Sequence, residues 1–431
     1  MDAFSDDQTA AGRADGRPGR PPISQRFQRS RTAVWIATVG PGLLVMLADT
    51  DAGNIVAAAD AGARWGYRLL PLPILLIPVL AMVQELAARI GIFSGGGFGD
   101  LLRQRTGRLV RTLAGLSLLI ATFASLTTEL SGITGVGEMF GLSRAFVLPA
   151  SAGLILAILL SGEYPRVQRL AIFIGLFELG FVAIAWISHP TAKMLFVDLP
   201  DQRFGDPGYL YIAAALIGAT FNPWMIFYQA SAIAELRTGE AGYRAARLDT
   251  WIGALVTQLL TAAVLLAAAA AVARGRAPGP LTEIGQISQF LEPVLGPTFG
   301  RLVFGLGVIG ASLAAAIVAS LAAIWGLGEL VSGREAFTPG RARGPFALAA
   351  AAVVVLSAIA VAATRDLVWL SVGLQVLNAL LLPFVAFLLV VMTATALPPD
   401  VRLKGVRLWL VVAAITLVAA AGLVGAATML M

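Results

Sequence analysis

The sequence predicts an all-α polytopic membrane protein, and three observations lead to this fold class. The chain of 431 residues is 58% hydrophobic, only 13% charged, and has a mean hydropathy of +0.82. Apolar stretches of spanning length recur throughout it, and two of them are interrupted by polar residues. The composition excludes a soluble globular protein.

Apolar stretches long enough to cross a bilayer indicate about eleven transmembrane helices. The connections between them are short, and the longest are rich in proline and glycine, so no soluble domain fits between the spans. We therefore expect a single transmembrane domain over residues 32–431. The expected spans are 33–60, 69–92, 110–140, 145–162, 170–188, 209–236, 251–273, 301–328, 346–363, 366–396 and 408–431.

Residues 1–31 contain six arginines among Asp, Gly and Pro and no apolar core, which predicts a disordered basic tail. If this tail is cytoplasmic, arginine and lysine clusters fall inside at alternate loops, as the positive-inside rule requires. We expect a multi-pass protein of the cell membrane with an extracellular C-terminus. The clusters are Arg103 to Arg111, Arg166 and Arg169, Arg237 to Arg247, Arg334 to Arg343, and Arg402 to Arg407.

The net charge of +6 and the pI of about 10.1 follow from that topology, so the expected partners are membrane lipids and not nucleic acid. Nothing in the sequence implies an obligatory protein partner. Cysteine is absent, which excludes disulfides and thiolate metal sites.

The first and sixth spans are interrupted at mid-membrane depth, at residues 48–54 (Ala-Asp-Thr-Asp-Ala-Gly-Asn) and 220–224 (Thr-Phe-Asn-Pro-Trp). A charge near the bilayer centre costs several kcal/mol, so the two aspartates need a compensating role. We expect Gly53 and Pro223 to break the helices and to free backbone carbonyls. Paired breaks of this kind mark the substrate site of many transporters.

The breaks lie in the first and sixth spans, so the first repeat holds five spans, an odd number, and the two halves lie in the membrane with opposite orientation. This spacing predicts the LeuT type of fold with a 5+5 inverted repeat. The first repeat covers about 33–188, the second about 209–396, and an extra helix about 408–431.

The two breaks offer only oxygen donors, which suit a hard divalent cation such as Mg²⁺, Mn²⁺ or Ca²⁺. Asp51 and Asn54 lie three residues apart and face one side if the turn stays nearly helical. Asp49 supplies an extra acid that could bind a hydrated ion through water. The expected ligands are the side chains of Asp51, Asn54, Asn222 and Asp49 and the carbonyls of Ala48, Ala219 and Thr220.

The sequence resembles the Nramp divalent-metal transporters over about residues 38–395. Pro41-Gly42-Leu43-Leu44 followed by Asp51-Ala52-Gly53-Asn54 is similar to the family's GPG…DPGN signature, and residues 218–224 are similar to its GAT-x-MPH segment. Further matches are residues 84–91, 128–130 and 247–250, and Gln375 eight residues before Pro383. The resemblance adds Gln375 to the candidate ligands.

The differences from the family pattern indicate which ions the protein transports and whether it is coupled to protons. Asn222 stands at the family's metal-binding methionine, and Trp224 and Gln229 stand at its histidines. Proton-coupled members carry acidic residues at two positions that are Thr122 and Gly132 in this sequence. Ala52 stands where the family signature has proline. This pattern resembles the Nramp-related magnesium transporters, which implies Mg²⁺ and Mn²⁺ transport without proton coupling.

We therefore expect a secondary transporter that imports Mg²⁺ and Mn²⁺ by alternating access, with no resident cofactor. The single histidine, His189, falls in a predicted external loop, which disfavours a proton relay. The alternatives are a proton-coupled Mn²⁺ or Fe²⁺ importer and a transporter of an organic substrate, against which Asp49 and Asp51 argue. No nucleophile and base, histidine cluster or phosphate loop indicates an enzyme. The run Ser94 to Asp100 is interpreted as a flexible internal loop.

Overall fold

The computed structural model describes Val45, Met46 and residues 48–161, 173, 174, 176–187, 199–275, 280–333 and 345–428. The expectations for the basic tail, His189 and the Pro41-Gly42 motif lie outside these residues. Within them the chain is helical and contains no strand, so the all-α fold class is confirmed.

Nine helical segments among the described residues are long and apolar enough to cross a membrane. The first expected span is described from Val45 onward, and the fifth is described in part as η1 and α10, which leaves the expected count of about eleven intact. The elements are α4 (Ala52–Trp65), α5 (Pro71–Phe93), α6 (Phe98–Arg105), α7 (Arg108–Met139), α8 (Arg144–Ser161), η1 (Leu176–Glu178), α10 (Leu179–Ile187), α12 (Pro207–Thr220), α13 (Pro223–Leu236), α14 (Glu240–Ala273), η2 (Ile284–Phe290), α15 (Glu292–Val331), α16 (Pro345–Ala363), α17 (Leu367–Thr395) and α18 (Gly405–Ala427).

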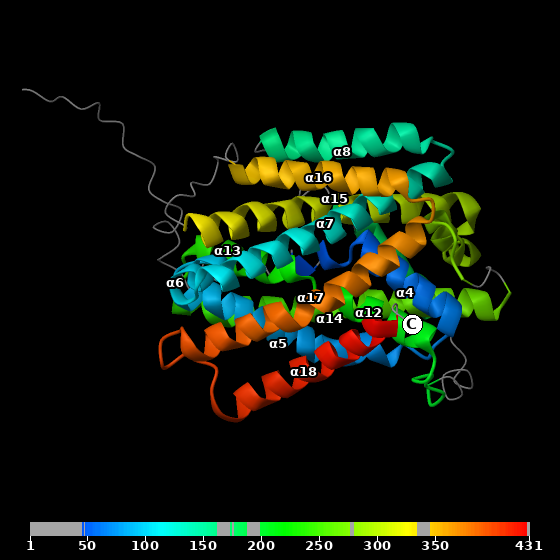
Figure 1. Ribbon diagram of the computed structural model, residues 1–431. Helices are drawn as coiled ribbons and strands as arrows, with labels where there is room; N and C mark the ends of the chain where they lie inside the picture. Colours follow the sequence, from blue (N-terminus) through cyan, green and yellow to red (C-terminus); the bar gives the residue numbers. More distant parts are fainter. Residues whose placement is uncertain are drawn as a thin grey trace, which may run out of the picture.

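The helices pack as one bundle with the interrupted helices at its centre. Helix α4 packs against α7, α12, α14 and α17, whereas α8 and α16 lie side by side at one edge and α18 lies at the opposite edge (Figure 1). Residues on α4 are almost all buried, in contrast to the half-exposed α8 and α18. The polar breaks are therefore enclosed by other helices instead of facing lipid, as the cost of an unpaired polar group in hydrocarbon requires.

The first break falls at Thr50 and Asp51, and the expectation that Gly53 makes it is wrong. Ala48 and Asp49 are helical, Thr50 is a bend, and Asp51 is the N-cap of α4 in an extended conformation. Gly53 lies inside α4, where a Cβ would stand 1.9 Å from Gln375 Nε2. The glycine is thus needed for the close approach of α17, and the aspartate cap starts the new helix.

The second break falls at Phe221 and Asn222, as the position of Pro223 predicts. Helix α12 ends at Thr220, Asn222 is extended, and Pro223 begins α13 at the first helical position. Proline suits this position because its missing N–H has no partner there and its fixed φ fits the helix.

Helix α7 runs between two chemically different ends of the bundle. We call one the arginine-rich end, defined by Arg103, Arg105, Arg108 and Arg111, and the other the pocket end, defined by Glu138, Arg144 and Arg365. A helix of 32 residues spans about 48 Å, which is enough to place the two ends on opposite sides of a bilayer.

The arginine-rich end is closed by packed side chains. The segment Ser94 to Asp100, expected to be a flexible loop, is non-helical only to Gly97, and α6 begins at Phe98. Phe98 is fully buried in contact with Phe227, and Gly99 N–H donates to Glu329 Oε2 at 3.2 Å. Ser231 Oγ on α13 donates to Glu329 Oε1 at 2.8 Å. Glu329 on α15 therefore joins α13 to the start of α6, a contact we call the Glu329 latch.

Candidate metal-binding site

Two fully buried aspartates, Asp49 and Asp51, flank Thr50 at the first break. Asp51 Oδ1 accepts a 2.7 Å hydrogen bond from the Asn54 N–H and so caps α4. Asp49 Oδ1 accepts from Asn222 Nδ2 at 3.4 Å, which joins the first break to the second. Asp49 Oδ2 has no hydrogen-bond partner among the described residues, and the Asp51 carboxyl faces the carboxyl group of Glu129.

Amide side chains from two other helices complete this centre. Asn222 Nδ2 also donates to the Ala219 carbonyl at 3.2 Å. Asn378 Nδ2 on α17 donates to Asn222 Oδ1 at 2.5 Å and to Gln375 Oε1 at 3.0 Å. The structure thus brings together Asp49, Asn222, Ala219 and Gln375, four of the residues expected from the sequence, although nothing bound tests their role as ligands.

Several buried polar atoms at this centre have no hydrogen-bond partner within the described part of the chain. Besides Asp49 Oδ2, Asn54 Nδ2, Gln375 Nε2 and Asn378 Oδ1 are buried and have no partner among the described residues. Buried polar groups are normally satisfied, so these atoms are candidates to bind an ion or water. No three His, Cys, Asp or Glu side chains of the described residues are grouped to hold a metal, so the two aspartates would act with amide and backbone oxygens.

The remaining predicted residues lie at the breaks with different orientations. Ala48 is buried directly before the first break. Asn54 Oδ1 accepts from Thr261 Oγ1 at 2.8 Å. The Thr220 hydroxyl donates to the Leu216 carbonyl and accepts from Gln258 Nε2, so this side chain is directed toward α14.

Sequence reasoning missed the polar side of α14 that holds both breaks. Thr257 donates to the Met46 carbonyl, Thr261 to Asn54, and Gln258 to Thr220. The available signal was the spacing of Thr257 and Thr261, which are polar residues four apart in a predicted membrane span and so lie on one face of the helix.

Sequence reasoning also missed a buried acid, Glu178, which lies at the junction of η1 and α10. Its carboxyl group bonds to the side chain of Thr50 in the first break, and its Oε1 has no partner among the described residues. The signal was an acid inside a predicted span, which is functional by default. Glu129 on α7 is the second nearby acid: it accepts from the Ala52 N–H at 3.2 Å and lies next to the Asp51 carboxyl.

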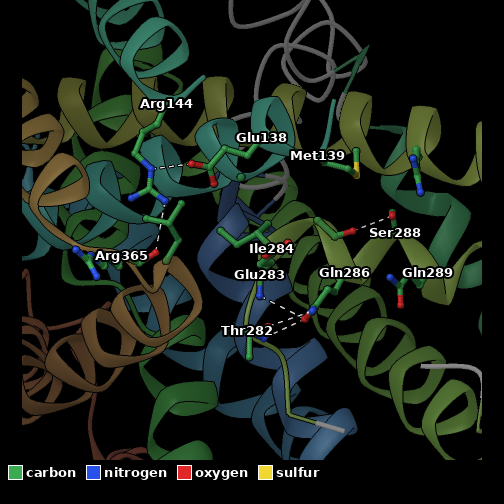
Figure 2. A pocket seen from close by; sticks show the side chains of 14 residues that line it. Glu138, Met139, Arg144, Thr282, Glu283, Ile284, Gln286, Ser288, Gln289 and Arg365 are labelled. Carbon is green, nitrogen blue, oxygen red and sulfur yellow. Dashed lines mark hydrogen bonds and ion pairs between the residues drawn. The ribbon is translucent and has the colours of Figure 1, made fainter. Parts of the chain in front are cut away.

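A cavity of about 560 Å³ opens at the pocket end and is lined mainly by polar groups from α7, η2 and the start of α17. Figure 2 shows Arg144 directed at Glu138, with which it forms a 2.7 Å ion pair, and Gln286 directed back at Thr282 and Glu283. The floor of this cavity includes Gly135, six residues from Glu129 and so about 9 Å farther along α7.

Tight packing separates this cavity from the aspartates. A Cβ on Gly135 would stand 2.7 Å from Ile284 Cβ, and one on Gly132 would stand 2.3 Å from the Ala52 side chain. Asp49 and Asp51 are 0% exposed, which means that neither end of the bundle opens onto them in this conformation.

The chain matches the Nramp family, described as natural resistance-associated macrophage protein-like, over residues 42–428. It is 29% identical over 375 residues to a protein of Bradyrhizobium diazoefficiens named divalent metal cation transporter MntH, covering 82% of this chain and 81% of that one. A protein of the same name from Verminephrobacter eiseniae is 26% identical over 311 residues, covering 68% and 69%.

The fold is also that of solved transporter structures. The manganese transporter of Eremococcus coleocola, in complex with an aromatic bis-isothiourea substituted compound, superposes with a TM-score of 0.69 at 19% identity, covering 94% of this chain and 87% of that one. Together with the other structural neighbours, this confirms the LeuT type of fold. The family match spans nearly the whole chain, and the chain therefore belongs to the Nramp family, a family of transporters.

Proposed function

We propose that this protein imports Mg²⁺ and Mn²⁺ across the cell membrane by alternating access, without coupling to protons. The observation that carries the proposal is the contact of Asp49 with Asn222 across the two breaks, beside an Asp49 oxygen that has no partner among the described residues. Carboxylate and amide oxygens are hard donors, and hard donors favour Mg²⁺ and Mn²⁺ over softer ions.

The path runs between the pocket end, placed outside the cell, and the arginine-rich end, placed in the cytoplasm. The positive-inside rule supports this orientation, because Arg103, Arg105, Arg108 and Arg111 lie together at one end of α7. An ion enters through the cavity beside Gly135, binds at the two breaks when Ile284 moves away, and leaves when the Glu329 latch opens.

The membrane potential is a sufficient driving force for a divalent ion. Two charges moving through 100 mV gain about 4.6 kcal/mol. That energy supports an accumulation of roughly two-thousandfold at equilibrium.

The second candidate is a proton-coupled Mn²⁺ or Fe²⁺ importer. The position of Glu129 next to Asp51 favours it, because two facing carboxylates repel each other unless a proton or a cation lies between them. The names of the relatives, which refer to divalent metal cations and to manganese, are compatible with both candidates.

Uptake into liposomes tests the proposal. Purified protein is reconstituted with a metal-sensing dye inside, a potassium diffusion potential is imposed, and Mg²⁺, Mn²⁺, Ca²⁺ and Fe²⁺ are added one at a time. Potential-driven entry of Mg²⁺ and Mn²⁺ is expected. Entry of Fe²⁺ and Mn²⁺ with exclusion of Mg²⁺ would contradict the proposed substrate.

A further inference from the structure

Asn378 holds the two candidate amide ligands with a single amino group. The side chain is 1% exposed, on α17, and its Nδ2 donates both to Asn222 Oδ1 at 2.5 Å and to Gln375 Oε1 at 3.0 Å. Asn222 belongs to a different broken helix, 156 residues away in the chain. The two oxygens are therefore held at a fixed separation by one residue.

The same contacts determine how the Asn222 amide is oriented. Because Asn378 presents N–H groups, Asn222 turns its oxygen toward α17 and its own amino group toward Asp49 Oδ1 and the Ala219 carbonyl. The result is one line of hydrogen bonds that joins Gln375, Asn378, Asn222 and Asp49, all buried. Removing Asn378 would leave the Gln375 and Asn222 oxygens without this donor, and Asn222 would then be held only through its amino group.

A donor bonded to a ligand oxygen does not prevent that oxygen from binding an ion. A carbonyl oxygen has two lone pairs, and a hydrogen bond to one leaves the other available. Groups that bond to metal ligands in this way fix their orientation and change metal affinity by about 10- to 100-fold.

We propose that Asn378 is a positioning residue that sets ion selectivity by fixing the orientation and separation of the Asn222 and Gln375 oxygens. This inference rests on the proposed function. Mg²⁺ demands nearly ideal octahedral geometry, whereas Ca²⁺ accepts variable geometry and ligand number. A loss of orientation therefore weakens Mg²⁺ binding more than Ca²⁺ binding.

The test compares Asn378→Leu, which removes both donors, with Asn378→Ser, which keeps one. Mn²⁺ uptake into liposomes is measured in competition with Mg²⁺ and with Ca²⁺. We expect the half-inhibiting Mg²⁺ concentration to rise about tenfold in Asn378→Leu and less in Asn378→Ser, with the Ca²⁺ value changed about twofold or less. Ser371→Ala is the matched control, because it removes a fully buried polar group of α17 that bonds only within that helix.

A double-mutant cycle separates positioning from direct binding. In an Asn222→Ala and Gln375→Ala background, Asn378→Leu should change the Mg²⁺ to Ca²⁺ ratio about twofold or less, because its partners are gone. An undiminished effect there would mean that Asn378 contacts the ion itself and would overturn the positioning role, as would a wild-type ratio in folded Asn378→Leu.

The outcomes also distinguish this inference from the function on which it rests. If wild-type protein transports no divalent ion, the proposed function fails irrespective of Asn378. If wild type transports Mg²⁺ and Asn378→Leu elutes as wild type on size exclusion, the change in the Mg²⁺ to Ca²⁺ ratio tests the positioning role of Asn378. If Asn378→Leu does not fold, Asn378→Ser decides it by the same ratio, and a wild-type value overturns the proposal.

Discussion

Asp51 combines two roles that a pair of substitutions can separate. It caps α4 through the Asn54 N–H and offers a second oxygen to an ion. Asp51→Asn keeps an acceptor for the cap and removes the charge, whereas Asp51→Ala removes both. We expect both to lower the apparent affinity for Mn²⁺ by about 10- to 100-fold, the worth of one charged interaction.

Only Asp51→Ala should also lose about 1 kcal/mol of stability, measured by thermal unfolding in detergent, because only it loses the cap. Asp206→Ala is the matched control, because Asp206 caps α12 through Gly208 and Tyr209 and is exposed away from the breaks. It should lose stability and keep transport. Full uptake by Asp51→Asn would remove the proposed site.

Asn222 is the residue at which a soft donor would change selectivity. Asn222→Met replaces an amide oxygen with a thioether, which favours Mn²⁺ and Fe²⁺ over Mg²⁺. We expect the ratio of Mg²⁺ to Mn²⁺ uptake to fall about tenfold in a two-ion competition, the size of effect that ligand environments usually have.

Thr220→Val is the control for this substitution, because the Thr220 hydroxyl is directed at Leu216 and Gln258. Its ratio should equal that of wild type. The same result in Asn222→Met would show that Asn222 does not bind the ion.

At the scale of elements, Gly97 makes the Glu329 latch possible. A Cβ on Gly97 would stand 2.1 Å and 2.3 Å from the Glu329 oxygens and 2.3 Å from Ser231 Oγ. Gly97→Ala should therefore push α15 and α13 apart, at a cost of about 1–3 kcal/mol to the closed arginine-rich end. The expected consequence is a larger population of molecules open at that end.

The absence of cysteine from the chain makes this measurable with a single introduced reporter. In Ala234→Cys, at the end of α13, maleimide labelling should accelerate when Gly97→Ala is added. Gly107→Ala serves as control, because a Cβ there meets nothing within 4 Å. An equal labelling rate in both variants would show that the latch does not hold this end closed.

At the scale of the whole molecule, the proposal predicts transport without proton movement. With a pH dye inside liposomes and a negative internal potential, metal should enter and the interior should not acidify. A pH gradient alone should not concentrate the ion. The physical reason is that the potential acting on two charges is sufficient.

If this prediction is wrong, two buried acids are the candidate proton carriers, and substitutions of each can identify which one carries the proton. Metal-dependent acidification that disappears in Glu129→Gln would place a proton at the carboxyl next to Asp51, and one that disappears in Glu178→Gln would place it at the carboxyl bonded to Thr50. Either result would favour the proton-coupled candidate.

The sequence alone determined the all-α membrane fold, most span limits and the places where two helices break. These depend on local chemistry: the hydropathy of a segment, the missing N–H of Pro223, and the cost of placing Asp49 and Asp51 in hydrocarbon. Several boundaries agree closely, such as the expected span 110–140 and helix Arg108–Met139. The role of Gly53 was misjudged because a glycine's neighbours are not visible in its own segment.

The tertiary structure decided which polar groups meet. Asp49 and Asn222 are 173 residues apart, and Asn378 reaches Asn222 from a third helix, so no local pattern specifies these contacts. The same holds for Glu178 at Thr50 and for Glu329 at Gly97. Apolar periodicity determines that a helix spans the membrane, but the direction each side chain faces depends on how the helices pack, and that packing assembles the candidate site from separate breaks.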